Sequence, residues 1–71
     1  MTSRNAGHED YTDVFATLVQ DTDDAYLIND SRVQEWVPKS QVEVECDGDP
    51  EIGKDYNFNM PEWLAIDKGF E

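Results

Sequence analysis

The apolar residues of this chain come in short runs, and turn-forming residues close nearly every run. Residues 11–19 are rich in β-branched and aromatic side chains, which favours a strand, although the residues alone do not exclude a short helix. In a strand, Val14, Ala16 and Leu18 would share one face and Phe15 would lie on the other. The polar cluster 20–24 then predicts a turn.

Two further runs predict a β-hairpin. Residues 25–28 and 32–37 are separated by the turn-prone residues 29–31, a spacing that is typical of a hairpin. Pro38 has no N–H group to donate, so we expect the second strand to end there. Residues 39–41 would then form a tight connection to the next strand.

The next segment alternates strictly. In residues 41–45, Val42 and Val44 fall on one side and Glu43 and Glu45 on the other. This pattern predicts a strand with one buried and one solvated face.

Glycine and proline mark residues 47–54 as a loop. A second alternating segment, residues 55–60, places Tyr56, Phe58 and Met60 on one face of a further strand.

The C-terminal residues predict a short helix. Pro61 is expected at the first helical position, where its missing N–H costs nothing, and Gly69 at the left-handed stop. Trp63, Ile66 and Phe70, with Leu64 alongside, would form one apolar stripe. Because so short a helix is not stable alone in water, it must dock on the sheet. The predicted fold is therefore α+β: a small antiparallel sheet of about four to five strands with one C-terminal helix packed on it.

A chain of 71 residues supports a single domain. We expect residues 1–9, which are small and polar, to be a flexible tail, and residues 10–71 to form the domain. The N-terminus has no apolar segment of a secretory signal, and the single cysteine, Cys46, cannot form an internal disulfide. Both features favour the cytoplasm, and we expect a monomer.

Charge is the strongest compositional signal. The chain holds 17 Asp and Glu against 5 Lys and Arg, a net charge of −12. Such a charge repels nucleic-acid phosphates and anionic membranes, so neither is an expected partner. Two interpretations stay open: the acidic side chains keep a small domain soluble, or they bind a basic surface of another protein.

The sequence shows no set of residues arranged for catalysis. The single histidine, His8, lies in the predicted tail, so no serine or cysteine has a positioned imidazole partner. Glu45 and Asp47 flank Cys46, and neighbouring carboxylates disfavour a thiolate. We therefore predict that the protein is not an enzyme.

Metal binding is also not predicted. Asp47, Asp49 and Glu51 have the spacing of alternating oxygen ligands. An EF-hand calcium loop would continue with glycine and glutamate where this chain has Ile52 and Phe58. We interpret the segment as an acidic turn and expect no cofactor.

A row of acids is the feature that suggests a site. Glu43 and Glu45 lie on one side of their strand, and same-side strand residues are about 6.5–7 Å apart, a spacing comparable with that of neighbouring phosphates along a nucleic-acid strand. Asp47 would continue this row if the strand extended. The predicted partner-binding acids are Glu43, Glu45, Asp47, Asp49, Glu51 and Asp55, followed by Asp21, Asp23 and Asp24. Trp36 is added as a candidate interface anchor, because Val33 and Val37 fall on the opposite face of its strand.

Two sequence blocks carry a resemblance. Residues 36–42 read WVPKSQV, and residues 61–69 read PEWLAIDKG. Together they resemble a group of small phage and prophage proteins over roughly residues 25–71. The resemblance implies the order hairpin, WVPKSQV block, acidic variable loop and terminal helix, and it implies no activity.

By type, a small acidic phage protein without catalytic residues is also similar to anti-CRISPR proteins, some of which are acidic DNA mimics. This resemblance implies an inhibitor that binds the basic DNA-binding subunit of a host CRISPR effector complex, of type I, in the host cytoplasm. It would block target DNA binding. The alternative is an accessory phage module that docks on a protein partner through Trp36 or the helix, with no mimicry.

Overall fold

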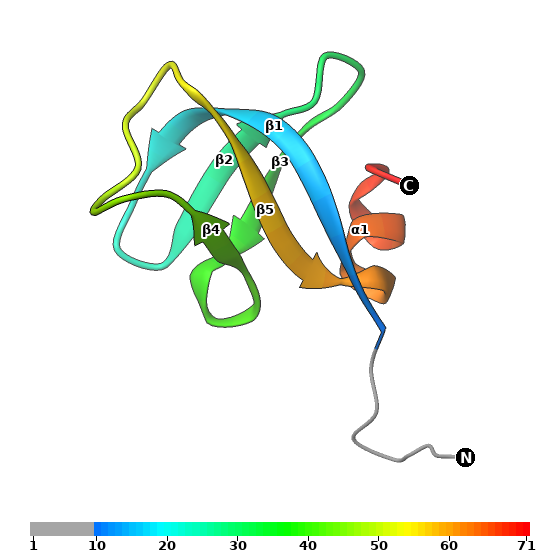
Figure 1. The fold of residues 1–71 in the computed structure, drawn as a ribbon. Coiled ribbons are helices and arrows are strands. Elements are labelled where there is room, and N and C mark those ends of the chain that lie inside the picture. The colour runs from blue at the N-terminus through cyan, green and yellow to red at the C-terminus, as the bar shows by residue number, and fades with distance from the viewer. Residues whose placement is uncertain (1–9) are drawn as a thin grey trace.

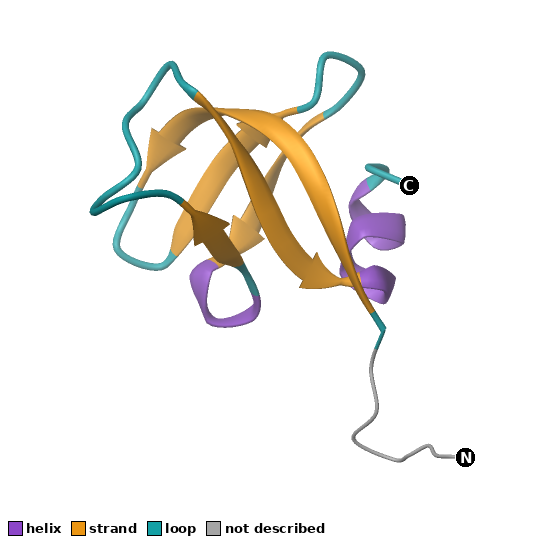
Figure 2. Ribbon diagram, viewed as in Figure 1, coloured by secondary structure: helices purple, strands orange, loops and turns teal. Residues whose placement is uncertain are grey.

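The computed structural model describes residues 10–71, which form one curved sheet and one short helix (Figure 1). The predicted tail, residues 1–9, lies outside the described residues. Helices, strands and loops are coloured separately in Figure 2. The described residues form five strands, one α-helix and one 3-10 helix. In chain order the elements are β1 Tyr11–Asp21, β2 Ala25–Asn29, β3 Gln34–Pro38, η1 Lys39–Gln41, β4 Glu43–Glu45, β5 Asp55–Pro61 and α1 Glu62–Lys68.

The sheet is antiparallel, with the strand order β3-β2-β1-β5-β4. The strand β1 is central: its first part pairs with β5 and its last part pairs with β2. β3 and β4 form the two edges, joined through η1. The predicted fold class is confirmed: this is a small α+β protein with a five-stranded antiparallel sheet and one C-terminal helix packed against it.

The first predicted turn begins later than expected. Gln20 and Asp21 continue β1 instead of leaving it, and they pair with Leu27 and Tyr26 of β2. The register shifts between Leu18 and Gln20, and such a bulge lets a long strand bend from one partner to the next.

The core lies on the inner, concave face of the sheet. The predicted face of β1 is confirmed, with Val14, Ala16 and Leu18 at most 5% exposed. Phe58 is fully buried and receives the rings of Tyr26 and Tyr56 edge-on, at centroid distances of 5.9 and 6.3 Å. The other buried apolar residues come from β2, β3, β5, the helix and the segments beside them: Ile28, Val37, Val42, Met60, Leu64, Ala65 and Phe70.

A buried carboxylate organises the turn of the predicted hairpin. The Asp30 side chain, only 8% exposed, accepts hydrogen bonds from the backbone N–H groups of Arg32 and Val33, at 2.9 and 2.8 Å, and pairs with the Arg32 guanidinium at 3.1 Å. Desolvation raises the pKa of Asp30, but these hydrogen bonds outweigh it and leave the pKa below its ordinary value. The same Arg32 nitrogen donates to the Phe70 carbonyl at 3.1 Å, so one cluster joins the hairpin to the C-terminus.

The helix ends as predicted. Gly69 adopts a left-handed conformation, with φ 89°, and its N–H donates to the Ile66 carbonyl while the N–H of Phe70 donates to the Ala65 carbonyl. This pair of bonds is a Schellman motif, and it folds Phe70 into the core. A Cβ placed on Gly69 would stand 3.5 Å from a methyl group of Val33, so the cap packs on the hairpin.

Two predictions about the helix are wrong. Pro61 is the last residue of β5 and precedes the first helical residue by one position. The predicted stripe is buried only in part: Trp63 is 53% and Ile66 56% exposed, whereas Phe70 and Leu64 are buried as expected, together with Ala65. Because α1 follows β5 without a loop, the strand fixes the rotational position of the helix.

Candidate functional site

The sheet presents a convex face that carries four carboxylates, defined here as the outer acidic face. They are Asp13 on β1, Glu43 and Glu45 on β4, and Asp55 at the start of β5, and all four are exposed. Strand alternation explains their common side, since their strand neighbours face the core.

The register places these acids in rows. Glu43 lies opposite Asn59, which lies opposite Asp13, so the first row crosses β4, β5 and β1. In the next row, Glu45 lies opposite Asn57. Adjacent strands are about 4.8 Å apart, and the face therefore alternates carboxylate and amide over three strands.

Hydrogen bonds hold this arrangement. The Asn57 amide donates to the Glu45 carboxylate at 3.3 Å, and the Asn59 amide donates to the Asp13 carboxylate at 3.0 Å. The Thr17 hydroxyl donates to Asp55. Each of these three carboxylates is thus oriented by a neutral donor. Glu43 has no such donor within the described chain.

The predicted acidic loop lies beyond the strand. β4 ends at Glu45, so the expected continuation of the strand row by Asp47 is wrong. Asp47, Asp49 and Glu51 are exposed in the loop between β4 and β5. The Tyr56 hydroxyl accepts a hydrogen bond from the Glu51 N–H at 2.8 Å, which ties the loop to β5.

The second predicted cluster lies at the same end of the sheet as this loop. Backbone hydrogen bonds join Gly53 and Lys54 of the loop to Leu18 of β1, at 2.7 and 2.9 Å. Asp21 ends β1 a few residues beyond Leu18, Asp23 and Asp24 lie in the turn that follows, and all three are exposed. Sequence alone does not bring the two clusters together; the pairing of β1 with the loop does.

Part of the negative charge is neutralised within the chain. Lys39 pairs with Asp21 at 2.6 Å, and its ammonium lies 4.8 Å from the centre of the Tyr26 ring. The hydrogen bond to Asp21 raises the pKa of Lys39 above its ordinary value. Lys54 contacts Glu51 at 3.9 Å on the exposed loop. Asp21 and Glu51 are therefore the weakest of the predicted binding residues.

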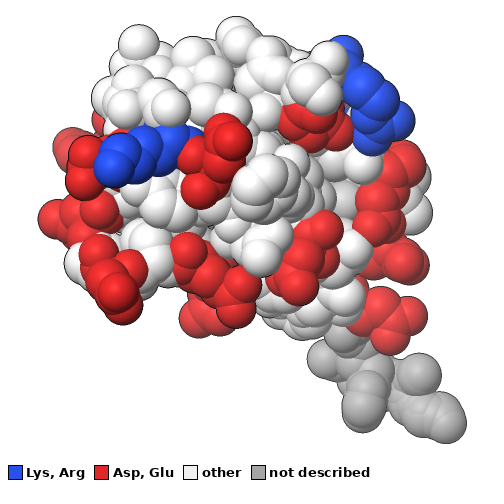
Figure 3. Space-filling model, turned by 45° about the horizontal axis from the view of Figure 1, so that its top comes forward, with Lys and Arg blue, Asp and Glu red and all other residues white. Residues whose placement is uncertain are grey.

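Within residues 10–71, no Lys or Arg side chain forms an ion pair with the carboxylates of the outer acidic face. Arg32, the nearest basic residue of the hairpin turn, is engaged with Asp30, and Asp13, Glu43, Glu45 and Asp55 form no ion pair with the described residues. Figure 3 shows carboxylates over much of the surface that it presents, whereas Lys and Arg appear only at its sides.

Trp36 lies on the edge strand β3 and is 43% exposed. Its strand neighbour Val37 is buried, in agreement with the expected opposite faces. The register places Trp36 beside Leu27, two strands from β1, so it stands apart from the outer acidic face.

Two residues of the outer face were missed by the sequence prediction. Asp13 is not among the predicted binding acids, and Phe15 is predicted only to lie on the face opposite Val14, Ala16 and Leu18. Phe15 is 63% exposed on the central strand and lies opposite Asn57, between the carboxylates. Their alternation with Val14 and Ala16 was the available signal, but their proximity to Glu43 and Glu45 depends on the pairing of β1 with β5.

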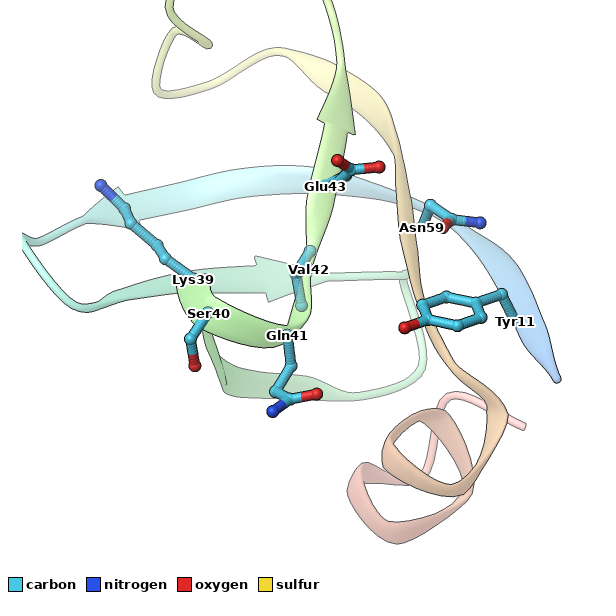
Figure 4. A pocket seen from close by; sticks show the side chains of 7 residues that line it. All are labelled: Tyr11, Lys39, Ser40, Gln41, Val42, Glu43 and Asn59. Carbon is cyan, nitrogen blue, oxygen red and sulfur yellow. The ribbon is translucent and has the colours of Figure 1, made fainter. Parts of the chain in front are cut away.

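The larger hollow of the surface, about 500 Å³, lies between η1, β4 and the start of β1. Figure 4 shows that the Lys39 amine, the Glu43 carboxylate and the Asn59 amide point in different directions from its walls. These groups do not converge on a common point, so the hollow offers no catalytic arrangement. Within residues 10–71 no group of acidic, histidine or cysteine side chains has the geometry to hold a metal ion.

No helix in the described part of the chain has the length and apolarity needed to cross a membrane. Comparison of the chain with protein-family models, curated proteins and solved structures finds no match. The function is therefore argued from the geometry of the outer face.

Proposed function

We propose that this protein is an inhibitor that binds the basic nucleic-acid-binding surface of another protein by imitating phosphates. The proposed partner is the DNA-binding subunit of a host CRISPR effector complex of type I. Carboxylates of the outer acidic face would occupy the Lys and Arg positions that hold target DNA, so DNA could not enter.

One observation carries this proposal: Glu43 and Glu45 stand exposed on the same side of β4, beside Asp13 and Asp55 on neighbouring strands. Same-side residues of a strand are about 6.5–7 Å apart. A row of charges at this spacing matches a surface built to contact successive phosphates.

The sheet gives the row its second useful property, which is rigidity. Side chains held on paired strands, with Asn57 and Asn59 orienting Glu45 and Asp13, lose little freedom on binding. Acids in a disordered segment would lose much more. The acidic loop and turn add negative potential at one end, which would steer a basic partner toward the protein.

Charge reversal tests the proposal. Glu43→Lys combined with Glu45→Lys should weaken binding to a purified type I effector complex by at least about tenfold. The matched control is Glu62→Lys with Asp67→Lys, which makes the same change of net charge on the exposed side of α1. Equal losses in the two variants would show that only total charge matters, and no loss in the first would refute the mechanism.

A second candidate function follows from Trp36, whose exposed ring on an edge strand is a typical interface anchor. The protein would then be a docking module of a phage assembly. Trp36→Ala would abolish such binding, and reversal of Glu43 and Glu45 would leave it unchanged.

A further inference from the structure

A small hollow next to Phe15 is distinct from the one in Figure 4. It measures about 200 Å³ and lies between the middle of β1, the start of β5 and the turn between β2 and β3. Its walls are formed by Phe15, Ala16, Thr17, Asn29, Asp30, Ser31 and Asp55.

One wall is an aromatic ring. Phe15 is 63% exposed although it lies on the central strand. None of the ring contacts of the described residues involves it. An exposed ring face on a rigid strand is available to stack on a planar cation.

The opposite wall carries a carboxylate that is already oriented. Asp55 lies opposite Thr17, which makes it a diagonal neighbour of Phe15, at about 7–8 Å between Cα atoms. The Thr17 hydroxyl donates to Oδ1 of Asp55, and Oδ2 accepts no hydrogen bond from the described residues. Asp55 and the exposed Phe15 ring therefore line the same hollow.

Hydrogen bonds hold the turn on the third side of the hollow. The side-chain oxygen of Asn29 accepts a hydrogen bond from the Ser31 N–H at 2.6 Å, and its amide donates to Gln34 at 3.1 Å. Arg32 follows directly but is directed elsewhere, since one guanidinium nitrogen contacts both Asp30 and the Phe70 carbonyl, each at 3.1 Å.

We propose that this hollow is the seat of one arginine side chain of the partner protein. The guanidinium would stack on the Phe15 ring and donate to Asp55, while Asp13 and Glu45 beside Phe15 hold further basic groups. A guanidinium is planar, weakly hydrated and has several N–H donors in a fork, so it can stack on an aromatic ring and donate hydrogen bonds to a carboxylate at the same time. A lysine ammonium does this less well. The seat is thus selective for arginine over lysine.

This inference rests on the proposed function, because it defines which basic side chain the outer face recognises. Its test uses an arginine-rich peptide and a lysine-rich peptide of equal length and charge, with binding measured by calorimetry. Wild-type protein should bind the arginine peptide more tightly. Phe15→Ala should weaken binding of that peptide by about two- to fivefold and leave the lysine peptide nearly unaffected.

Two variants sharpen the result. Phe15→Leu keeps an apolar side chain but removes the ring face, so it should lose as much arginine preference as Phe15→Ala. Ile52→Ala is the control for loss of an exposed apolar side chain outside the hollow, and it should bind both peptides as the wild type does. Thermal unfolding verifies that each variant is folded.

Equal binding of the two peptides by the wild type, or full arginine preference in Phe15→Leu, would overturn the arginine seat. Those outcomes are separate from failure of the proposed function. A protein that binds the effector complex but shows no arginine preference contradicts only the seat, and one that prefers arginine but does not bind the complex contradicts only the proposed partner.

Discussion

Replacement of Asp30 by alanine should be the most damaging change of a single acid in this acidic protein. Its carboxylate is buried and accepts two backbone hydrogen bonds, at 2.9 and 2.8 Å, besides pairing with Arg32. The variant leaves the N–H groups of Arg32 and Val33 without their acceptor. It also weakens the contact between Arg32 and Phe70.

The magnitude follows from these contacts. A hydrogen bond to a charged group contributes about 1.5–3 kcal/mol, but water can reach part of the exposed turn, so we expect a total loss of about 2–3 kcal/mol. For a domain of this size, that corresponds to a fall in Tm of about 10–20 °C. Asp30→Asn, which keeps an acceptor for the two N–H groups, should lose only about 1 kcal/mol.

Urea unfolding measures both losses. Asp23→Ala is the matched control, because it removes the same charge from an exposed side chain that makes no ion pair with the described residues. The lowered pKa of Asp30 adds a pH signature: its contribution is present above the unfolded pKa of about 3.9 and is lost as pH falls through the folded value. If Asp30→Ala and Asp23→Ala unfold at the same urea concentration, the reasoning is refuted.

Three further predictions concern the same framework. Gly69→Ala should destabilise the fold by about 1–2 kcal/mol, measured by urea unfolding. The cost comes from the left-handed backbone conformation, which disfavours any side chain, and not from a clash with Val33. Lys39→Met should lower Tm. Because the hydrogen bond to Asp21 raises the pKa of Lys39, the difference in Tm between the wild type and this variant should shrink as pH rises past about 10.4. A difference in Tm that stays the same at higher pH would contradict the ion pair. Because the net charge is −12, added NaCl should raise Tm by screening the repulsion between carboxylates. A Tm that falls with added salt would show that the ion pairs stabilise the fold by more than this repulsion destabilises it.

Much of the sheet was predictable because β1, β4 and β5 alternate with a period of two. Val14, Ala16 and Leu18 alternate with polar or exposed residues, and their common face is buried as expected. The same holds for Phe58 and Met60 on β5. Local patterns of this kind depend on neighbouring residues alone.

The helix shows where such patterns fail. Trp63 and Ile66 are spaced as a core stripe, yet both are exposed. A helix of two turns is too short for its own periodicity to decide which side is buried. The direct connection from β5 decides it, together with the Schellman turn that inserts Phe70 from beyond the helix.

The candidate site was predicted in part, for a related reason. The alternation around Glu43 and Glu45 gave their common side. Asp13 and Phe15 lie far from them in sequence, and only the antiparallel pairing of β1 with β5 places all four on one face. Long-range pairing of this kind cannot be derived from the period of a single strand.

The proposed imitation of DNA is tested most directly by the salt dependence of binding to a purified type I effector complex, measured with and without target DNA. We predict binding at about 0.1 M salt that is lost at about 0.5 M, because contacts between exposed charges are screened. We also predict that target DNA competes with the protein. Binding that is unchanged by salt, or that persists together with bound target DNA, would contradict the account.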